Sequence, residues 1–229
     1  MKTWSYSSIS TFKQCPKKYY HLRVLKDVKD DTSAALVYGR DAHKAAEHYV
    51  KDGTPLPQVF SFMQGTLDAF NAIEGDKHCE IRFGVKRSFS TARPAPDLDY
   101  EPCKFFADDV WWRGIADLLI INGTRGYLVD YKTGKNARYA DTKQLDLLAA
   151  ATFTHFPEIE TLKSALVYVV SNDFIKKEHK AELRDSYFAT FDPELERLAG
   201  AEESGVWNAI SGPLCRFCPV LTCEHNRRD

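Results

Sequence analysis

The spacing of apolar residues changes character along the chain. Toward both ends and around residue 145, apolar residues recur every three to four positions, which is typical of helices, whereas the middle carries short runs rich in Ile, Val, Phe, Trp and Leu, which is typical of strands. Helices are expected at 7–23 (with a break near Pro16), 34–50, 57–74, 141–154 and 192–210. Strands are expected at 79–87, 103–112, 114–121, 126–132 and 162–170, and a polar hairpin around 171–191. This order predicts an α/β fold, a mixed central sheet flanked by helices, with a helical N-terminal elaboration and a Cys-rich C-terminal tail.

The length indicates one domain. A chain of 229 residues can bury a hydrophobic core of its own. We expect a single domain over 1–229, made of a helical part at 1–75, a sheet core at 76–191, and a C-terminal helix with the Cys-rich tail at 192–229.

The net charge is close to zero. The chain has 31 Lys and Arg residues against 32 Asp and Glu residues, which gives a formal charge of −1. This balance excludes a simple polycation that wraps nucleic acid, but it is compatible with a local basic groove.

The sequence carries no signal for a membrane or for export. No apolar run reaches the roughly 18 residues of a membrane-spanning helix, and the N-terminus opens no signal peptide. We therefore expect a cytoplasmic protein with no membrane partner. In a reducing compartment, the six cysteines are better explained as metal ligands than as a disulfide framework.

Two carboxylates and a lysine stand at the ends of adjacent expected strands. Asp117 interrupts an apolar run, and Asp130 and Lys132 follow on the next strand, which the Asn-Gly pair at 122–123 folds back on the first. Strand alternation places Asp130 and Lys132 on one face and Tyr131 on the other. Carboxylates at a strand end suit Mg²⁺ or Mn²⁺, and the lysine can orient a water or contact a phosphate. The alternative is a structural ion pair, because Asp-x-Lys also occurs by chance.

Two further polar residues lie on expected helices. His43 follows Gly39 in the first long helix, and Gln144 heads the helix after the Asp130 strand. Taken alone, His43 has the pattern of a surface or satisfied core residue, and Gln144 that of a helix cap or surface residue.

Together these motifs resemble the PD-(D/E)XK nuclease superfamily, and more narrowly its RecB-type branch, which includes the AddB nuclease domain and the CRISPR-associated adaptation nucleases. The resemblance implies a restriction-endonuclease-like core. It implies that His43, Asp117, Asp130 and the backbone carbonyl of Tyr131 bind the metal, and that Lys132 is catalytic. Gln144 matches the family's Q-x3-Y element, although Leu148 stands at the tyrosine position. Glu80 resembles an acidic position often found on the first strand.

Four of the cysteines form a ligand pattern. Cys215, Cys218 and Cys223 give C-x2-C-x4-C near the end of the chain, and Cys15 lies far upstream. Four thiolates can hold either zinc or a [4Fe–4S] cluster. The resemblance favours the cluster, because AddB-type nucleases carry this one-plus-three arrangement as an iron–sulfur staple. Zinc and four unrelated thiols are the alternatives.

A basic, aromatic segment surrounds Cys15. Cations next to tyrosines suit single-stranded DNA, whose phosphates pair with cations and whose bases stack on rings. The candidate DNA contacts are Lys13, Lys17, Lys18, Tyr20 and Arg23. The alternative is a solvated helix face packed beside the cysteine cluster.

The resemblance implies a Mg²⁺- or Mn²⁺-dependent deoxyribonuclease, an exonuclease on DNA ends or single strands in recombination, repair or replication. A structure-specific or adaptation-type endonuclease, and a non-catalytic iron–sulfur DNA-binding protein, remain alternatives. The sequence has no G-x4-G-K-[ST] loop, so we expect a stand-alone nuclease that could work with a helicase or recombination partner. Exonuclease polarity and oligomeric state stay open.

Overall fold

The computed structural model describes residues 3–29, 33–90, 97–134, 137 and 140–227. The chain divides into two compact units, a larger one formed by Ala34–Ala189 and a smaller one formed by Met1–Ser33 together with Thr190–Asp229. Helix 34–52 therefore belongs to the unit that contains the sheet. The functional division of the chain at residues 75 and 191 stays a prediction.

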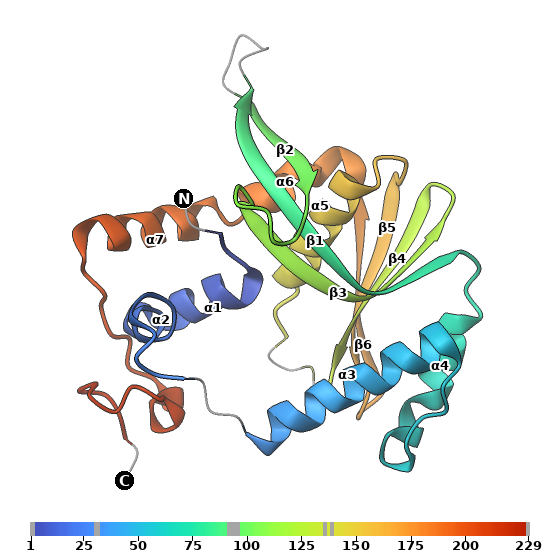
Figure 1. Cartoon of the computed structure of the whole chain (residues 1–229), viewed down its shortest axis with the longest axis horizontal. Coiled ribbons are helices and arrows are strands. Elements are labelled where there is room, and N and C mark those ends of the chain that lie inside the picture. The colour runs from blue at the N-terminus through green and yellow to red at the C-terminus, as the bar shows by residue number, and fades with distance from the viewer. Residues whose placement is uncertain (1–2, 30–32, 91–96, 135–136, 138–139, 228–229) are drawn as a thin grey trace. The chain divides into compact units, whose positions relative to one another are not determined.

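The larger unit is built on one six-stranded mixed sheet in the order β2-β1-β3-β4-β5-β6 (Figure 1). Its strands are β1 (Asp76–Ser90), β2 (Asp97–Cys103), β3 (Trp112–Asn122), β4 (Arg125–Lys132), β5 (Thr161–Tyr168) and β6 (Asp173–Lys180). Neighbouring strands are antiparallel except β4 and β5, which run parallel. Helix α5 (Lys143–His155) makes the crossover that a parallel pair requires. The predicted class, a mixed sheet flanked by helices, is confirmed.

Helices cover both faces of this sheet. The helices α3 (Ala34–Asp52), η2 (Gln58–Met63) and α4 (Gln64–Asn71) bury apolar residues against Leu118, Val129 and Tyr131. Because side chains alternate along a strand, Leu128 and Asp130 face the other side, where Gln144 of α5 reaches Asp130. Helix α5 is buried along most of its length, and η3 (Ala181–Leu183) and α6 (Arg184–Ala189) follow β6. The carboxylates thus sit at a point that helices approach from both faces.

The strand expected at 103–112 was wrong. Strand β2 ends at Cys103, and 104–111 form turns and irregular backbone. The aromatic residues of this segment mimicked a strand because a loop can bury large side chains as well as a strand can. Trp111 is buried, and its backbone N–H donates to the Val85 carbonyl at 2.8 Å.

Other element boundaries also shift. The helix expected at 57–74 is split into η2 and α4. The segment around 171–191 is not a hairpin of its own, because β6 pairs with β5 and helices follow it. In the smaller unit, α7 (Asp192–Ser204) ends before Gly205, whose φ of 69° is a common helix stop.

The smaller unit brings the two ends of the chain together. It contains α1 (Tyr6–Gln14), α2 (Pro16–Tyr19), η1 (Tyr20–Leu25), α7 and η4 (Pro213–Phe217). A capping box at Ser5 starts α1, and Pro16 at the start of α2 gives the predicted break. Phe12 and Tyr19 pack edge to face, and Tyr19 stacks on Trp207. None of the helices in the described ranges has the length and apolarity to span a membrane.

Candidate active site

The β3–β4 hairpin positions the two predicted carboxylates. The turn at 122–123 uses Gly123 with a φ of 58°, and the strands pair from Asn122↔Arg125 to Leu118↔Val129. Asp117 lies just beyond the last of these pairs. Its Oδ2 accepts a hydrogen bond of 2.6 Å from the backbone N–H of Tyr131. The carboxylates therefore meet where the two strands begin to part.

Asp130, Lys132 and Gln144 form a closed polar group. The Lys132 Nζ lies 2.5 Å from the Asp130 Oδ2 and donates to the Gln144 Oε1 at 3.0 Å. The Gln144 Nε2 donates to the Asp130 Oδ1 at 2.7 Å. Only 6% of the Asp130 side chain is exposed, against 33% of the Lys132 side chain. The lysine is therefore more exposed than the carboxylate it pairs with, and Gln144 hydrogen-bonds to both of them.

A second group consists of His43, Glu80 and Asp117, from α3, β1 and β3. The His43 Nδ1 lies 3.0 Å from the Asp117 Oδ1. One ligand atom from each of the three residues lies within 4.8 Å of the others. An imidazole nitrogen and two carboxylate oxygens can hold a divalent cation that keeps further positions for water and substrate.

Glu80 owes its position to an unusual backbone conformation. The neighbouring pairs Cys79↔Leu118 and Ile81↔Ala116 place Glu80 opposite Asp117. Its φ of 49° is rare for a residue other than glycine, and inside a strand it costs on the order of 1–3 kcal/mol. Such strain is retained where the surrounding structure determines it, and here it accompanies two adjacent carboxylates. In the sequence, only the resemblance pointed to Glu80.

The electrostatics of the site favour a cation. Burial, and then the charge of Asp117, raise the pKa of Asp130 to about 6 against the opposing effect of Lys132. The same two causes raise the pKa of Glu80. Burial tends to lower the pKa of His43, but its hydrogen bond to Asp117 and the nearby carboxylates outweigh it, so the pKa is raised. Carboxylates crowded in this way are stabilised by a positive charge between them.

The structure thus divides the predicted metal set. His43 and Asp117 lie together with Glu80, while Asp130 lies in the adjoining group with Lys132 and Gln144. Tyr131 contributes its backbone N–H to Asp117, and its ring packs edge to face against His43 at 6.0 Å. A ligand role for Asp130 and for the Tyr131 carbonyl stays a prediction.

Comparison with known proteins identifies the family. A sequence model of the PD-(D/E)XK nuclease superfamily matches residues 3–223, nearly the whole chain. The chain belongs to this superfamily. The mixed sheet with flanking helices agrees with its restriction-endonuclease-like core. No curated protein matches the sequence.

Two solved structures resemble this chain over most of its length. One, from Eubacterium rectale and described as a putative exonuclease, is 13% identical with a TM-score of 0.51, covering 97% of this chain and 87% of that one. The crystal structure of SSO0001 is 11% identical with a TM-score of 0.49, covering 99% of this chain and 88% of that one. At such low identities, this likeness concerns the fold alone.

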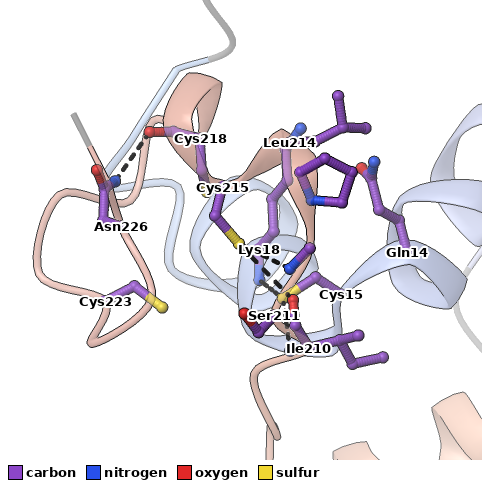
Figure 2. A pocket seen from close by; sticks show the side chains of 12 residues that line it. Gln14, Cys15, Lys18, Ile210, Ser211, Leu214, Cys215, Cys218, Cys223 and Asn226 are labelled. Atoms are coloured by element: carbon purple, nitrogen blue, oxygen red, sulfur yellow. Dashed lines mark hydrogen bonds between the residues drawn. The ribbon is translucent and has the colours of Figure 1, made fainter.

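In this nuclease, the four predicted ligand cysteines line one pocket of the smaller unit (Figure 2). The pocket has a volume of about 180 Å³ and is lined by Cys15, Cys215, Cys218 and Cys223 among others. The Cys15 sulfur accepts backbone N–H groups from Lys18 and Ile210, both at 3.5 Å. The Cys215 sulfur accepts that of Gly212 at 3.3 Å. Backbone donors of this kind suit thiolates that bind a metal group.

The other cysteines lie apart from this pocket. Cys79 on β1 packs at the edge of the apolar cluster under α3, and Cys103 ends β2. Burial raises the pKa of both thiols. Both side chains are half-buried.

The predicted DNA-contact residues lie in the smaller unit, on the helices that contain or flank Cys15. Lys17 forms an ion pair of 2.6 Å with Glu224, and the Lys13 Nζ lies 4.0 Å from Glu194. Tyr20 stacks on Trp207 with ring centroids 5.1 Å apart. Of the remaining two residues, Lys18 lines the cysteine pocket and Arg23 is exposed. Acidic partners and ring packing thus engage three of the five residues, and their role in DNA binding stays a prediction.

Proposed function

We propose that this nuclease is a Mg²⁺- or Mn²⁺-dependent deoxyribonuclease that acts as an exonuclease on DNA ends or single strands. The observation that carries the proposal is the meeting of a possible ligand group (His43, Glu80, Asp117) with a polar group that exposes a lysine (Lys132 with Asp130 and Gln144). Nucleases of this superfamily use divalent metal ions.

Each residue has a distinct part in this proposal. Asp117, Glu80 and His43 would hold the cation, and the Tyr131 N–H keeps the Asp117 carboxylate turned toward it. A bound divalent ion supplies an acidified water and neutralises charge on the scissile phosphate. Lys132, whose side chain is partly exposed beside the buried Asp130, would orient the attacking water or contact a phosphate oxygen. Gln144 hydrogen-bonds to both Lys132 and Asp130, so it would act as a positioning residue that fixes their side chains.

The exonuclease assignment rests on the resemblance to RecB-type nucleases and on the description of the Eubacterium rectale structure. The same branch suggests a role in DNA recombination, repair or replication, beside a helicase or recombination partner. Exonucleases require an end, whereas endonucleases do not, so a substrate without ends separates the two activities.

The test compares end-labelled single strands, end-labelled duplexes and covalently closed circles, each with Mg²⁺ or Mn²⁺. The wild type should degrade the linear substrates and leave the circles intact. Glu80→Gln and Lys132→Met should each lower the rate by at least about 100-fold. Lys163→Met is the matched control, because Lys163 lies on β5 and forms an exposed ion pair with Glu178.

The outcomes are decisive. Cutting of closed circles would identify an endonuclease and overturn the exonuclease proposal. Metal-independent cleavage, or equal rates in the wild type, Glu80→Gln and Lys132→Met, would overturn the proposed site.

We further propose that the cysteine pocket holds a [4Fe–4S] cluster. The support is that Cys15, Cys215, Cys218 and Cys223, which come from the two ends of the chain, line one pocket. Four thiolates can hold either zinc or a [4Fe–4S] cluster, and the resemblance to AddB-type nucleases favours the cluster.

Iron and acid-labile sulfide analysis, with visible absorption, tests this proposal. The wild type should be brown with about four iron atoms per chain, and Cys218→Ser should lose both colour and thermal stability. Cys103→Ser, outside the pocket, is the control and should keep the colour. Stoichiometric zinc without iron would identify a zinc site and overturn the proposal.

A further inference from the structure

A patch of arginines and phenylalanines covers part of β1, β3 and the segment between β2 and β3. Phe105 and Phe106 pack edge to face with ring centroids 4.8 Å apart. The Arg113 guanidinium lies 5.5 Å from the Phe105 ring and 5.9 Å from the Phe106 ring, and Arg82 lies 5.8 Å from Phe105. Phe106 is 73% exposed, and the neighbouring Ile115 is 37% exposed. We call these five residues the Phe106 patch.

The Phe106 patch lies away from α5. The Phe83 ring packs on His155 of α5, and a Cβ added at Gly114 would lie 3.4 Å from Leu148 of the same helix. Side chains alternate along a strand, so the residues next to these two, Arg82 and Arg113 among them, face the opposite side.

The patch also continues toward the metal-ligand group. Arg82 is two residues from Glu80 on β1, about 7 Å along the strand. Arg113 is four residues from Asp117 on β3, about 13 Å along the strand. The charge of Arg82 also tends to lower the pKa of Glu80, against the larger effects of burial and of Asp117. A ligand on the patch would therefore extend toward the carboxylates.

The two guanidiniums are available to an anion. Within the described residues, no carboxylate lies within 4.0 Å of Arg82 or Arg113. By contrast, Lys86 further along β1 forms an ion pair of 2.6 Å with Asp109. The two guanidiniums instead lie 5.5–5.9 Å from the centres of phenylalanine rings, and a guanidinium near a ring can still donate N–H groups to an anion.

We propose that the Phe106 patch binds a single-stranded stretch of nucleic acid next to the scissile phosphate. A base would stack on the exposed Phe106 ring, and Arg82 and Arg113 would bind the phosphates on either side. A duplex keeps its bases paired and stacked on one another, so an exposed ring selects an unpaired base. The proposal rests on the proposed function, because it gives the patch a place beside that active site.

The test measures binding of a fluorescent single-stranded oligonucleotide by anisotropy in EDTA, so cleavage plays no part. Phe106→Ala should weaken binding roughly 5- to 100-fold, while Phe106→Trp should retain it. Arg82→Gln and Arg113→Gln should each reduce the slope of log K against log salt by about 0.7. The control is Phe174→Ala, because Phe174 on β6 is also exposed and also lies near a cation, Lys176 at 5.6 Å.

Stacking gives a second readout. A 2-aminopurine base in the oligonucleotide should be quenched by the wild type and by Phe174→Ala, and much less by Phe106→Ala. Equal binding and quenching by the wild type and Phe106→Ala would overturn the proposal, as would equal affinity for a blunt duplex and a single strand. A protein that binds as proposed but cleaves no DNA would leave the patch standing and remove the proposed function.

Discussion

Replacing His179 with glutamine should flatten the dependence of folding stability on pH between 7.5 and 5. His179 lies on β6 with its side chain fully buried. Its Nε2 is 2.8 Å from the Ser164 Oγ, and its Nδ1 is 3.5 Å from the Asp146 Oδ1. Lys177 already binds both oxygens of Asp146, at 2.6 and 2.7 Å. The carboxylate therefore has little attraction left for a protonated imidazole.

The sign and size of the effect follow from the pKa. Burial lowers the pKa of His179 from 6.5 to about 4, although Asp146 opposes this. The folded protein keeps the imidazole neutral, whereas the unfolded chain binds a proton below pH 6.5, so stability falls as the pH falls. The shift of about 2.5 units corresponds to about 2 kcal/mol lost at pH 5 and about 3 kcal/mol at the acid limit.

Asp130 acts in the opposite direction. Its folded pKa is raised to about 6 from 3.8, so it adds stability as the pH falls below 6. This contribution is the same in the wild type and in His179→Gln. The difference between the two pH profiles therefore isolates the histidine.

The assay is urea unfolding followed by tryptophan fluorescence at several pH values. All variants carry Trp4→Phe and Trp207→Phe, so the fluorescence comes from Trp111 and Trp112, which are both buried in the larger unit. Wild-type stability relative to His179→Gln should drop by about 2 kcal/mol between pH 7.5 and 5. His48→Gln, on the exposed side of α3, is the control and should follow the wild type. Parallel profiles for the wild type and His179→Gln would refute the reasoning.

Three further substitutions probe the fold and the site. Lys177→Met removes the partner of the buried Asp146 and should lower the unfolding free energy by about 1–3 kcal/mol in urea. Gly75→Ala should lower the melting temperature by several degrees, because the φ of Gly75 is 132° and the added carbon would lie 2.3 Å from a backbone oxygen of β3. Gly65→Ala is the control and should leave the melting temperature unchanged, because the space around Gly65 is open. Gln144→Ala should reduce kcat roughly 10- to 100-fold with metal affinity little changed in calorimetry; an unchanged kcat would remove its positioning role.

Local patterns determined a large part of the larger unit. The Asn-Gly pair predicted the β3–β4 turn, and the period of two along β4 predicted that Asp130 and Lys132 share a face, where they form an ion pair. These predictions succeed because turn chemistry and strand alternation depend on neighbouring residues only. In the same way, Pro16 marked the break between the first two helices.

Other features depended on packing between distant segments. The contact between His43 and Asp117 joins residues 74 positions apart, and the left-handed backbone of Glu80 has no signal in its own neighbours. The aromatic segment at 104–111 reads as a strand, yet it lies across β1 as a loop and carries the rings that Arg82 and Arg113 contact.

The sequence by itself therefore determined the fold class, the central hairpin and the residue types of the site. Only the tertiary structure decided that Glu80 joins His43 and Asp117, and that Arg82 and Arg113 meet the Phe105 ring. The physical reason is that periodicity along the sequence indicates which side of a helix or strand is buried. Which residue a side chain contacts depends on how distant segments pack in the folded chain.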